Sequence, residues 1–175
     1  SLLLMAIRIG EIRGKYTMDQ AMEYRNGILK LADGLENALL NMDEQAYALA
    51  EQWKDLEAYE FIGSGPEYAT AWFGHAKVFE ATGKYSMHIN TEEWLHLNFF
   101  MRRFDKIGAI ILTGSQNKAH NRTNELLGYA NQMGRPMLTI TDAPEMLSLG
   151  TASCITTPAA DDEIFNPLVQ CAPIC

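Results

Sequence analysis

The sequence predicts an α/β fold: a three-layer α-β-α sandwich around a five-stranded parallel sheet, preceded by N-terminal helices. Two observations lead to this prediction. Short apolar runs alternate with amphipathic helical segments along most of the chain, and this alternation is typical of βαβ units and parallel sheets. The runs are almost continuously apolar, which indicates a sheet that helices cover on both faces.

Five short stretches are expected to be strands: residues 59–63, 85–90, 107–114, 136–142 and 152–158. Helices are expected over residues 68–81, 92–104 and 119–133, and the tail from residue 164 resembles the opening of another helix. Ligands of parallel sheets bind at the carboxyl ends of the strands. The loops after Ile62, Asn90, Leu112 and Ile140 therefore form the expected working edge.

Two helices are expected before the first strand, across residues 17–56. Thr17 and Gln20 have the spacing of a capping box, and Asn41 with Glu44 indicates a second helix start. Residues 1–16 are expected to form a helix from the end of a preceding unit. Their apolar run is far shorter than the roughly 20 residues of a membrane helix, and it lacks the cleavage site of a signal peptide.

The composition excludes several classes of function. A net charge of −8 argues against nucleic-acid binding, which needs a basic surface. The chain has three cysteines, an odd number without a CxxC pair, which favours a reducing, cytoplasmic setting. The four histidines have no ligand-like spacing, so neither a metal nor another cofactor is expected.

Gly63, Ser64 and Gly65 lie between a strand and a helix. Glycines allow a sharp turn, and the N–H groups of a helix start can bind an anion. A tight turn without a ligand explains the same pattern, and both interpretations stay open. A dinucleotide-binding fingerprint needs a third glycine three residues later, where this chain has Tyr68. Nucleotide binding is therefore disfavoured.

Lys77 and Glu80 lie three residues apart on the helix that follows, so they share a face. An apolar stripe of Tyr68, Trp72, Ala76 and Phe79 is expected to face the core, with Glu80 at its margin. A carboxylate at a core margin, held by a nearby ammonium, suits a general base. A solvated ion pair is the alternative.

Two further groups of polar residues follow strands. Glu92, Glu93 and His96 open the next expected helix, and histidine can exchange a proton near neutral pH. Thr113, Ser115 and Gln116 follow the third strand and could bind phosphate or sugar hydroxyls. Ordinary helix-start acidity and ordinary loop polarity explain these groups equally well.

Taken together, these segments resemble the sugar isomerase (SIS) domain family. The match begins at Phe61-Ile-Gly-Ser-Gly-x-x-Tyr68 and continues through Gly74-His-Ala-Lys77-x-x-Glu80 and Glu93-x-x-His96. The separation from Glu80 to His96 is 96 − 80 = 16 residues, which is the family's spacing. Within this family, the segments more closely resemble the second SIS half of the isomerase module of glucosamine-6-phosphate synthase and of the related fructosamine-6-phosphate deglycases. A flavodoxin-like SIS fold is implied.

The resemblance also implies roles for the matched residues. Glu80 is similar to the family's base, which moves a proton between C1 and C2 of an open-chain sugar phosphate, and Lys77 to its neighbouring ammonium. His96 is similar to the histidine that helps to open the sugar ring and reaches the site from a neighbouring subunit, so a homodimer is implied. Residues implied at the substrate are Gly63, Ser64, Gly65, Tyr68, Glu93, Thr113 and Ser115.

The sequence departs from the family at two places. Leu97-Asn98 replaces the Gly-Pro of the synthase, which favours a deglycase-like or an uncharacterised branch over the synthase itself. The Ser-x-Ser-Gly-x-Thr loop, with which the family's first SIS half holds phosphate, does not occur. Residues 57–175 are therefore expected to be a truncated C-terminal SIS domain, the catalytic-base half of a phosphosugar isomerase or deglycase. The alternative is a non-catalytic module for sugar-phosphate sensing or for dimerisation.

Overall fold

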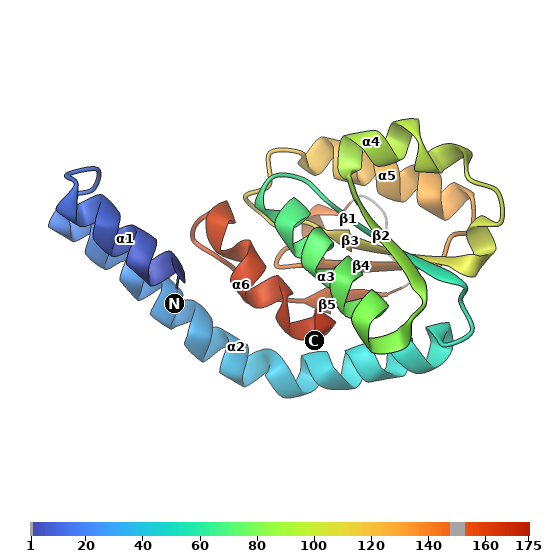
Figure 1. The fold of residues 1–175 in the computed structure, drawn as a ribbon, viewed down its shortest axis with the longest axis horizontal. Helices are drawn as coiled ribbons and strands as arrows, with labels where there is room; N and C mark the ends of the chain where they lie inside the picture. Colours follow the sequence, from blue (N-terminus) through green and yellow to red (C-terminus); the bar gives the residue numbers. More distant parts are fainter. Residues whose placement is uncertain (1, 148–152) are drawn as a thin grey trace.

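The protein is described from a computed structural model that covers residues 2–147 and 153–175 (Figure 1). Within these residues, five parallel strands form one sheet in the order β2-β1-β3-β4-β5. The strands are β1 (Ala58–Gly63), β2 (Tyr85–Asn90), β3 (Ile107–Leu112), β4 (Met137–Thr141) and β5 (Cys154–Thr156). All five expected strands are confirmed, and only Ala152 of the expected 152–158 run lies outside the described residues.

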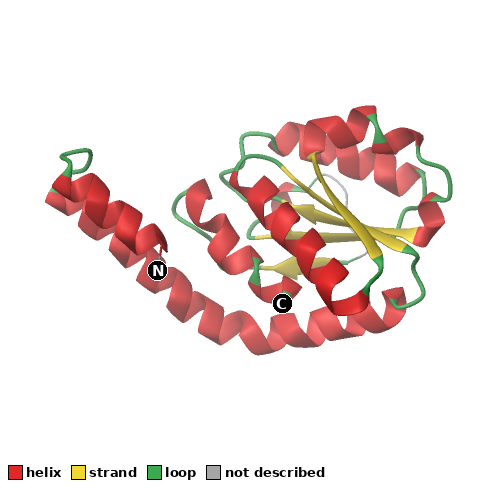
Figure 2. Cartoon of the chain, in the orientation of Figure 1, coloured by secondary structure: helices red, strands yellow, loops and turns green. Residues whose placement is uncertain are grey.

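The sheet is the middle layer of three. Helices α2 (Met18–Trp53) and α3 (Pro66–Thr82) cover one face, while α4 (Thr91–His96) and α5 (His120–Gln132) cover the other (Figures 1 and 2). Successive strand residues supply the two cores, since Ile110 packs on the α2 and α3 side and Ile111 on the α4 and α5 side. The predicted three-layer α-β-α sandwich is confirmed.

The N-terminal part of the chain forms a hairpin of helices that extends away from the sheet (Figure 1). α1 (Leu2–Ile12) packs on α2, and the expected capping box of Thr17 and Gln20 begins α2. The short helix α6 (Asn166–Gln170) joins this region to the sheet through a small core of Leu31, Ala160, Phe165 and Val169.

The prediction of two helices across residues 17–56 is wrong, because α2 is continuous through Asn41. The Asn41 and Glu44 pattern caps a helix only where the chain leaves the helical path. Nothing near Asn41 breaks that path: its neighbours Leu39 and Leu40 are strong helix formers, and neither proline nor glycine is close by.

The helix expected over residues 92–104 is also shorter than predicted, since α4 ends at His96 and a 3-10 turn follows at Asn98–Phe100. Asn98 is buried, and its side-chain amide donates to Glu60 at 2.8 Å. Its carbonyl accepts from Arg135 at 3.0 Å. If α4 continued through Asn98, the side-chain amide and the carbonyl of Asn98 would point in other directions and could not reach Glu60 and Arg135.

The apolar stripe of α3 does not face the core, so that prediction is wrong. Trp72 is 61% exposed and Phe79 is 52% exposed. The buried face carries Ala71 and Gly74 instead, and a Cβ added at Gly74 would lie 2.4 Å from the Phe61 ring. Small residues let α3 approach β1 closely, and its aromatic residues are left on the outer face.

No helix among the described residues is long and apolar enough to cross a membrane.

Candidate functional site

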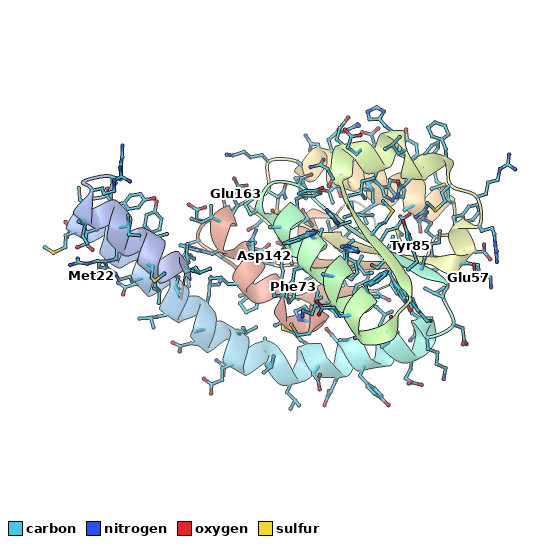
Figure 3. The ribbon with its side chains drawn as sticks, in the orientation of Figure 1. Met22, Glu57, Phe73, Tyr85, Asp142 and Glu163 are labelled. Carbon is cyan, nitrogen blue, oxygen red and sulfur yellow. The ribbon has the colours of Figure 1, made fainter. Side chains whose placement is uncertain are left out.

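The carboxyl edge of the sheet has a switch point between β1 and β3. The helix after β1 covers one face and the helix after β3 covers the other, so a crevice is expected between their loops. Figure 3 shows Asp142 at this edge and Glu57 at the opposite one. The loops that follow β1, β3 and β4 come together here.

The glycine turn after β1 has a structural cause. A Cβ at Gly63 would lie 2.6 Å from the Glu67 carbonyl oxygen, so the first turn of α3 packs directly on this residue. Gly65 has a φ of 61°, which side chains rarely adopt. Pro66 then begins the helix. Ser64 is half-buried, while Tyr68 is exposed on the first turn of the helix.

The polar loop after β3 is largely bonded within the chain. The Ser115 hydroxyl donates to Asp142 Oδ2 at 2.7 Å, and its backbone N–H donates to Oδ1 at 2.6 Å. Buried Thr113 accepts a hydrogen bond at its carbonyl from Gln170 at 2.9 Å. Asn117 donates to the Ser64 carbonyl at 3.2 Å and so links this loop to the glycine turn.

Glu67 is a fully buried carboxyl group in the first turn of α3. Asn166 of α6 donates to its Oε1 at 2.7 Å. Oε2 has no partner among the described residues. Burial raises the pKa of Glu67, and the hydrogen bond from Asn166 opposes that rise. This hydrogen bond joins the first turn of α3 to α6 beside the glycine turn.

Lys77 and Glu80 form the predicted pair, with 2.7 Å between Lys77 Nζ and Glu80 Oε2. Both side chains are partly exposed on the outer face of α3. The hydrogen bond to Glu80 raises the pKa of Lys77, so the ammonium stays protonated. The Lys77 ammonium also lies over the Phe73 ring, 5.6 Å from its centre. The pair sits near the end of α3, far from the glycine turn.

His96 lies in the last turn of α4 and has a carboxylate partner. Its Nε2 is 3.0 Å from Glu92 Oε1. Glu92 also binds Arg122 of α5 through two hydrogen bonds, at 2.6 and 2.9 Å. Arg122 is the main cause of the lowered pKa of Glu92, and His96 contributes further. Glu93 is exposed beside them.

The helix that carries His96 is fixed from below by a buried polar cluster. Arg135 Nη1 donates to Glu60 Oε2 at 2.6 Å. The Trp94 indole N–H donates to the same oxygen at 2.8 Å. Asn98 binds the other oxygen of Glu60, and the Arg135 guanidinium lies 5.0 Å from the centre of the Trp94 ring.

Within one chain, Glu80 and His96 do not come together. α3 packs on one face of the sheet and α4 on the other, so the sheet separates the two side chains. α3 also runs from the carboxyl edge to the amino edge, and β2 then returns the chain to the start of α4.

Sequence reasoning did not single out Glu60, Glu67, Arg122 or Arg135 as site residues. Glu60 interrupts an apolar strand, and a charge inside such a run is a signal of a buried pair. Glu67 had no comparable signal, because acidic residues are ordinary in a first helical turn. The part of the chain that the structure describes has no group of three or more His, Cys, Asp or Glu residues that could hold a metal ion.

Comparison with known proteins defines the class of fold. The structure superposes on the C-terminal domain of glucosamine-fructose-6-phosphate aminotransferase from Francisella tularensis with a TM-score of 0.86, at 17% identity, covering 97% of this chain and 47% of that one. It also matches the sugar isomerase domain of the RpiR transcription factor from Sphaerobacter thermophilus, with a TM-score of 0.64 at 17% identity, covering 86% and 82% of the two chains. A third match is the Vibrio vulnificus NanR protein complexed with ManNAc-6P, with a TM-score of 0.59 at 14% identity, covering 82% and 53%. The chain therefore has the SIS fold.

One relative at the level of sequence is an aminotransferase. Over 81 residues the sequence is 36% identical to the glutamine–fructose-6-phosphate aminotransferase (isomerizing) of Thermotoga maritima. The matched stretch covers 46% of this chain and 13% of that protein. The chain thus spans about half of the F. tularensis domain and matches a small part of the whole T. maritima enzyme. No protein-family model matches the chain.

Proposed function

We propose that this chain is the catalytic-base half of a phosphosugar isomerase or of a fructosamine-6-phosphate deglycase. It acts on an open-chain sugar phosphate of the fructose 6-phosphate or fructosamine 6-phosphate class. The observation that carries the proposal is the Lys77–Glu80 contact of 2.7 Å. Lys77, Glu80 and His96 also follow one another in the order and spacing of the SIS family. The similarity to an aminotransferase that bears the name isomerizing supports the same class of reaction.

In the proposed reaction, Glu80 takes a proton from the carbon beside the carbonyl group and returns it to the neighbouring carbon. The enediolate formed when the proton is removed carries negative charge, which a nearby cation stabilises until the proton is returned. Lys77 supplies that positive charge, because its hydrogen bond to Glu80 keeps it protonated. His96 helps to open the sugar ring before the proton transfer.

Sugar binding is assigned to seven residues at the carboxyl edge: Gly63, Ser64, Gly65, Tyr68, Glu93, Thr113 and Ser115. Within one chain they lie at the other end of α3 from Lys77 and Glu80, so they would reach the sugar held at Glu80 only from a second copy. Tyr68, Gly65 and Glu93 are exposed and so accessible to a ligand. Thr113 and Gly63 are buried, which limits them to shaping the loops. Ser115 already donates to Asp142, so its hydroxyl is available to the sugar as an acceptor. Phosphate is held by another unit, since the sequence has no Ser-x-Ser-Gly-x-Thr loop.

The active form is proposed to be a homodimer in the cytoplasm. Glu80 and His96 lie on opposite layers of one chain, so His96 from a second copy must complete the site. Trp72 and Phe79 expose large apolar surfaces on the face of α3 that also carries Glu80, and such surfaces commonly mark protein interfaces. Three free cysteines agree with a reducing compartment.

The experiment that tests the function uses the full-length parent, the longer protein of which this chain is proposed to be one half. Glu80→Gln is expected to abolish turnover of both sugar phosphates while leaving their binding, measured by calorimetric titration, nearly intact. Glu51→Gln is the matched control, because Glu51 forms a similar exposed pair with Lys54 on α2 at 3.2 Å. Normal turnover in Glu80→Gln would contradict the assignment of the base. The 175-residue chain alone is expected to turn over poorly.

A second candidate function is a non-catalytic sensor of sugar phosphates or a dimerisation module. The separation of Glu80 from His96 within one chain favours it, since a sensor does not need the two residues together. Saturable sugar-phosphate binding without turnover, unchanged in Glu80→Gln, would identify the sensor. If the protein shows no sugar-phosphate binding and no turnover, dimerisation is the role that is left.

A further inference from the structure

Glu92 links two helices at the carboxyl edge of the sheet. Arg122 of α5 donates from Nε to Glu92 Oε2 at 2.6 Å and from Nη2 to Oε1 at 2.9 Å. This two-point contact between planar groups fixes the orientation of the carboxylate, as single contacts to lysine cannot. Arg122 also binds Glu125 one turn further along α5. Glu125 accepts one hydrogen bond, whereas Glu92 makes the two-point contact that fixes its own carboxylate.

The same Glu92 oxygen that accepts from Nη2 contacts His96. Glu92 Oε1 and His96 Nε2 are 3.0 Å apart, four residues apart on α4. The helix beneath them is rigidly placed, because Trp94 is fully buried and donates to Glu60. His96 is therefore oriented in two ways. The buried Trp94 fixes the backbone of α4, and Glu92 fixes the imidazole ring.

The chemistry of the contact determines which ring nitrogen carries the proton. Arg122 keeps Glu92 ionised by lowering its pKa. An ionised carboxylate can only accept hydrogen bonds, so His96 Nε2 must be the donor. In the neutral ring, Nδ1 is then the unprotonated nitrogen with a lone pair.

We propose that Glu92, held by Arg122, is a positioning residue for His96 that fixes the Nε2–H tautomer and offers Nδ1 to the sugar. Nδ1 accepts the proton of the anomeric hydroxyl group, whose oxygen forms the carbonyl as the bond between the anomeric carbon and the ring oxygen breaks. The imidazolium, which Glu92 stabilises, then returns the proton to the departing ring oxygen. This arrangement follows the same logic as other carboxylate–histidine pairs, in which the carboxylate orients the ring and balances its charge. The role of His96 in ring opening rests on the proposed function. The Nε2–H tautomer does not, because it follows from the contact with Glu92 alone.

The first arm of the test is nuclear magnetic resonance of the 175-residue chain labelled with ¹⁵N-histidine. The His96 signals are assigned by their loss in His96→Gln. In the wild type at a pH where the ring is neutral, we expect a protonated Nε2 and an unprotonated Nδ1. Glu92→Ala is expected to shift both nitrogens toward an average of the two tautomers. A wild-type ring protonated at Nδ1, or identical shifts in Glu92→Ala, would overturn the proposal.

Glu125→Ala is the matched control for this measurement. Glu125 also binds Arg122, but no hydrogen bond or ion pair among the described residues joins it to His96. Its substitution removes one carboxylate from the same arginine and is expected to leave the His96 signals as in the wild type. An equal change of the His96 signals in Glu125→Ala and in Glu92→Ala would show that the general surface charge, and not the direct contact with Glu92, determines the tautomer of His96.

The second arm measures turnover by the full-length parent. Glu92→Ala is expected to lower kcat about tenfold or more, since losing a general acid–base contribution costs roughly 10²–10⁴-fold and a displaced ring loses part of it. Glu125→Ala is expected to stay within about twofold of the wild type on the same scale. If the parent has no turnover but the ¹⁵N result holds, the proposed function fails and the positioning role stands. Full turnover in Glu92→Ala would overturn the positioning role alone.

Discussion

Arg135 and Glu60 form an ion pair in the protein interior, with 2.6 Å between Nη1 and Oε2 and side chains that are 0% and 2% exposed. Two charges removed from water are stable only when each is paired and hydrogen-bonded. Trp94 and Asn98 provide the remaining hydrogen bonds to the carboxylate. The pair therefore joins β1 and the start of β4 to the segment that carries His96.

Glu60→Gln is predicted to destabilise the protein strongly. The substitution leaves Arg135 buried without a counter-charge, and breaking a buried pair in this way costs roughly 3–5 kcal/mol. Urea unfolding followed by circular dichroism measures the loss. Arg103→Gln is the control, because the Arg103–Glu57 pair is exposed and 2.6 Å long; its loss is expected to have no measurable effect. Equal stability of the two variants would contradict a structural role for the buried pair.

Glu67→Gln is predicted to stabilise the protein at neutral pH but not in acid. Burial raises the folded-state pKa of Glu67 above its ordinary value of 4.5. The folded state therefore binds the proton more tightly, and stability falls as the pH rises from 4.5 through the folded pKa. Glutamine stays neutral at every pH and keeps an oxygen for Asn166. Unfolding curves at pH 4 and pH 7.5 should differ in the wild type more than in Glu67→Gln.

The control for that measurement is Glu44→Gln, an exposed glutamate on α2. It is expected to change both curves by the same small amount. A gain in Glu67→Gln that is equal at both pH values would show that burial of the charge is not the cause.

The cysteines are predicted to differ in reactivity. Burial raises the pKa of Cys171 to about 11 and also raises that of Cys154. The thiolate is the reactive form, so both should react slowly with a disulfide reagent at pH 8. Cys175 is exposed and should be modified first. Mass spectrometry of partly labelled protein would give the order, and early labelling of Cys171 would contradict its burial.

Trp72→Glu is predicted to dissociate the proposed homodimer of the parent protein. Trp72 is 61% exposed on the outer face of α3, and a charge there would be trapped in an apolar interface. Sedimentation velocity should change from a dimer to a monomer. Tyr47→Glu is the matched control, since Tyr47 is an exposed aromatic residue on α2. A monomeric wild type, or a dimeric Trp72→Glu, would contradict the interface.

Much of the fold was predictable because it depends on local patterns. Each strand is a short apolar run that ends in a turn, and the Thr17 capping box marks the start of α2 correctly. The Lys77–Glu80 contact was also predictable, since residues three apart on a helix share a face. Its position on the outer face was not, because the stripe of Tyr68, Trp72 and Phe79 has a helical period but is largely exposed. Tyr68 and Trp72 contact the ring of His88 on the edge strand β2, at 5.3 and 6.5 Å between ring centres, and not the core.

The other departures have distant causes. α4 ends early because Asn98 binds Glu60, 38 residues away in the chain. Arg122 reaches Glu92 across 30 residues, and Asn166 reaches Glu67 across 99. No short sequence window contains both members of these pairs, so neither periodicity nor spacing could predict them.

Hydrophobic runs and helical spacing were thus sufficient to predict the three-layer α-β-α sandwich and to place Lys77, Glu80 and His96 on their helices. Packing decided which face each helix turns to the sheet, which loop polar groups are already bonded, and that the sheet separates Glu80 from His96. The reason is physical: secondary structure follows from residues near one another in the chain. The orientation of a side chain depends instead on which distant surfaces pack against it.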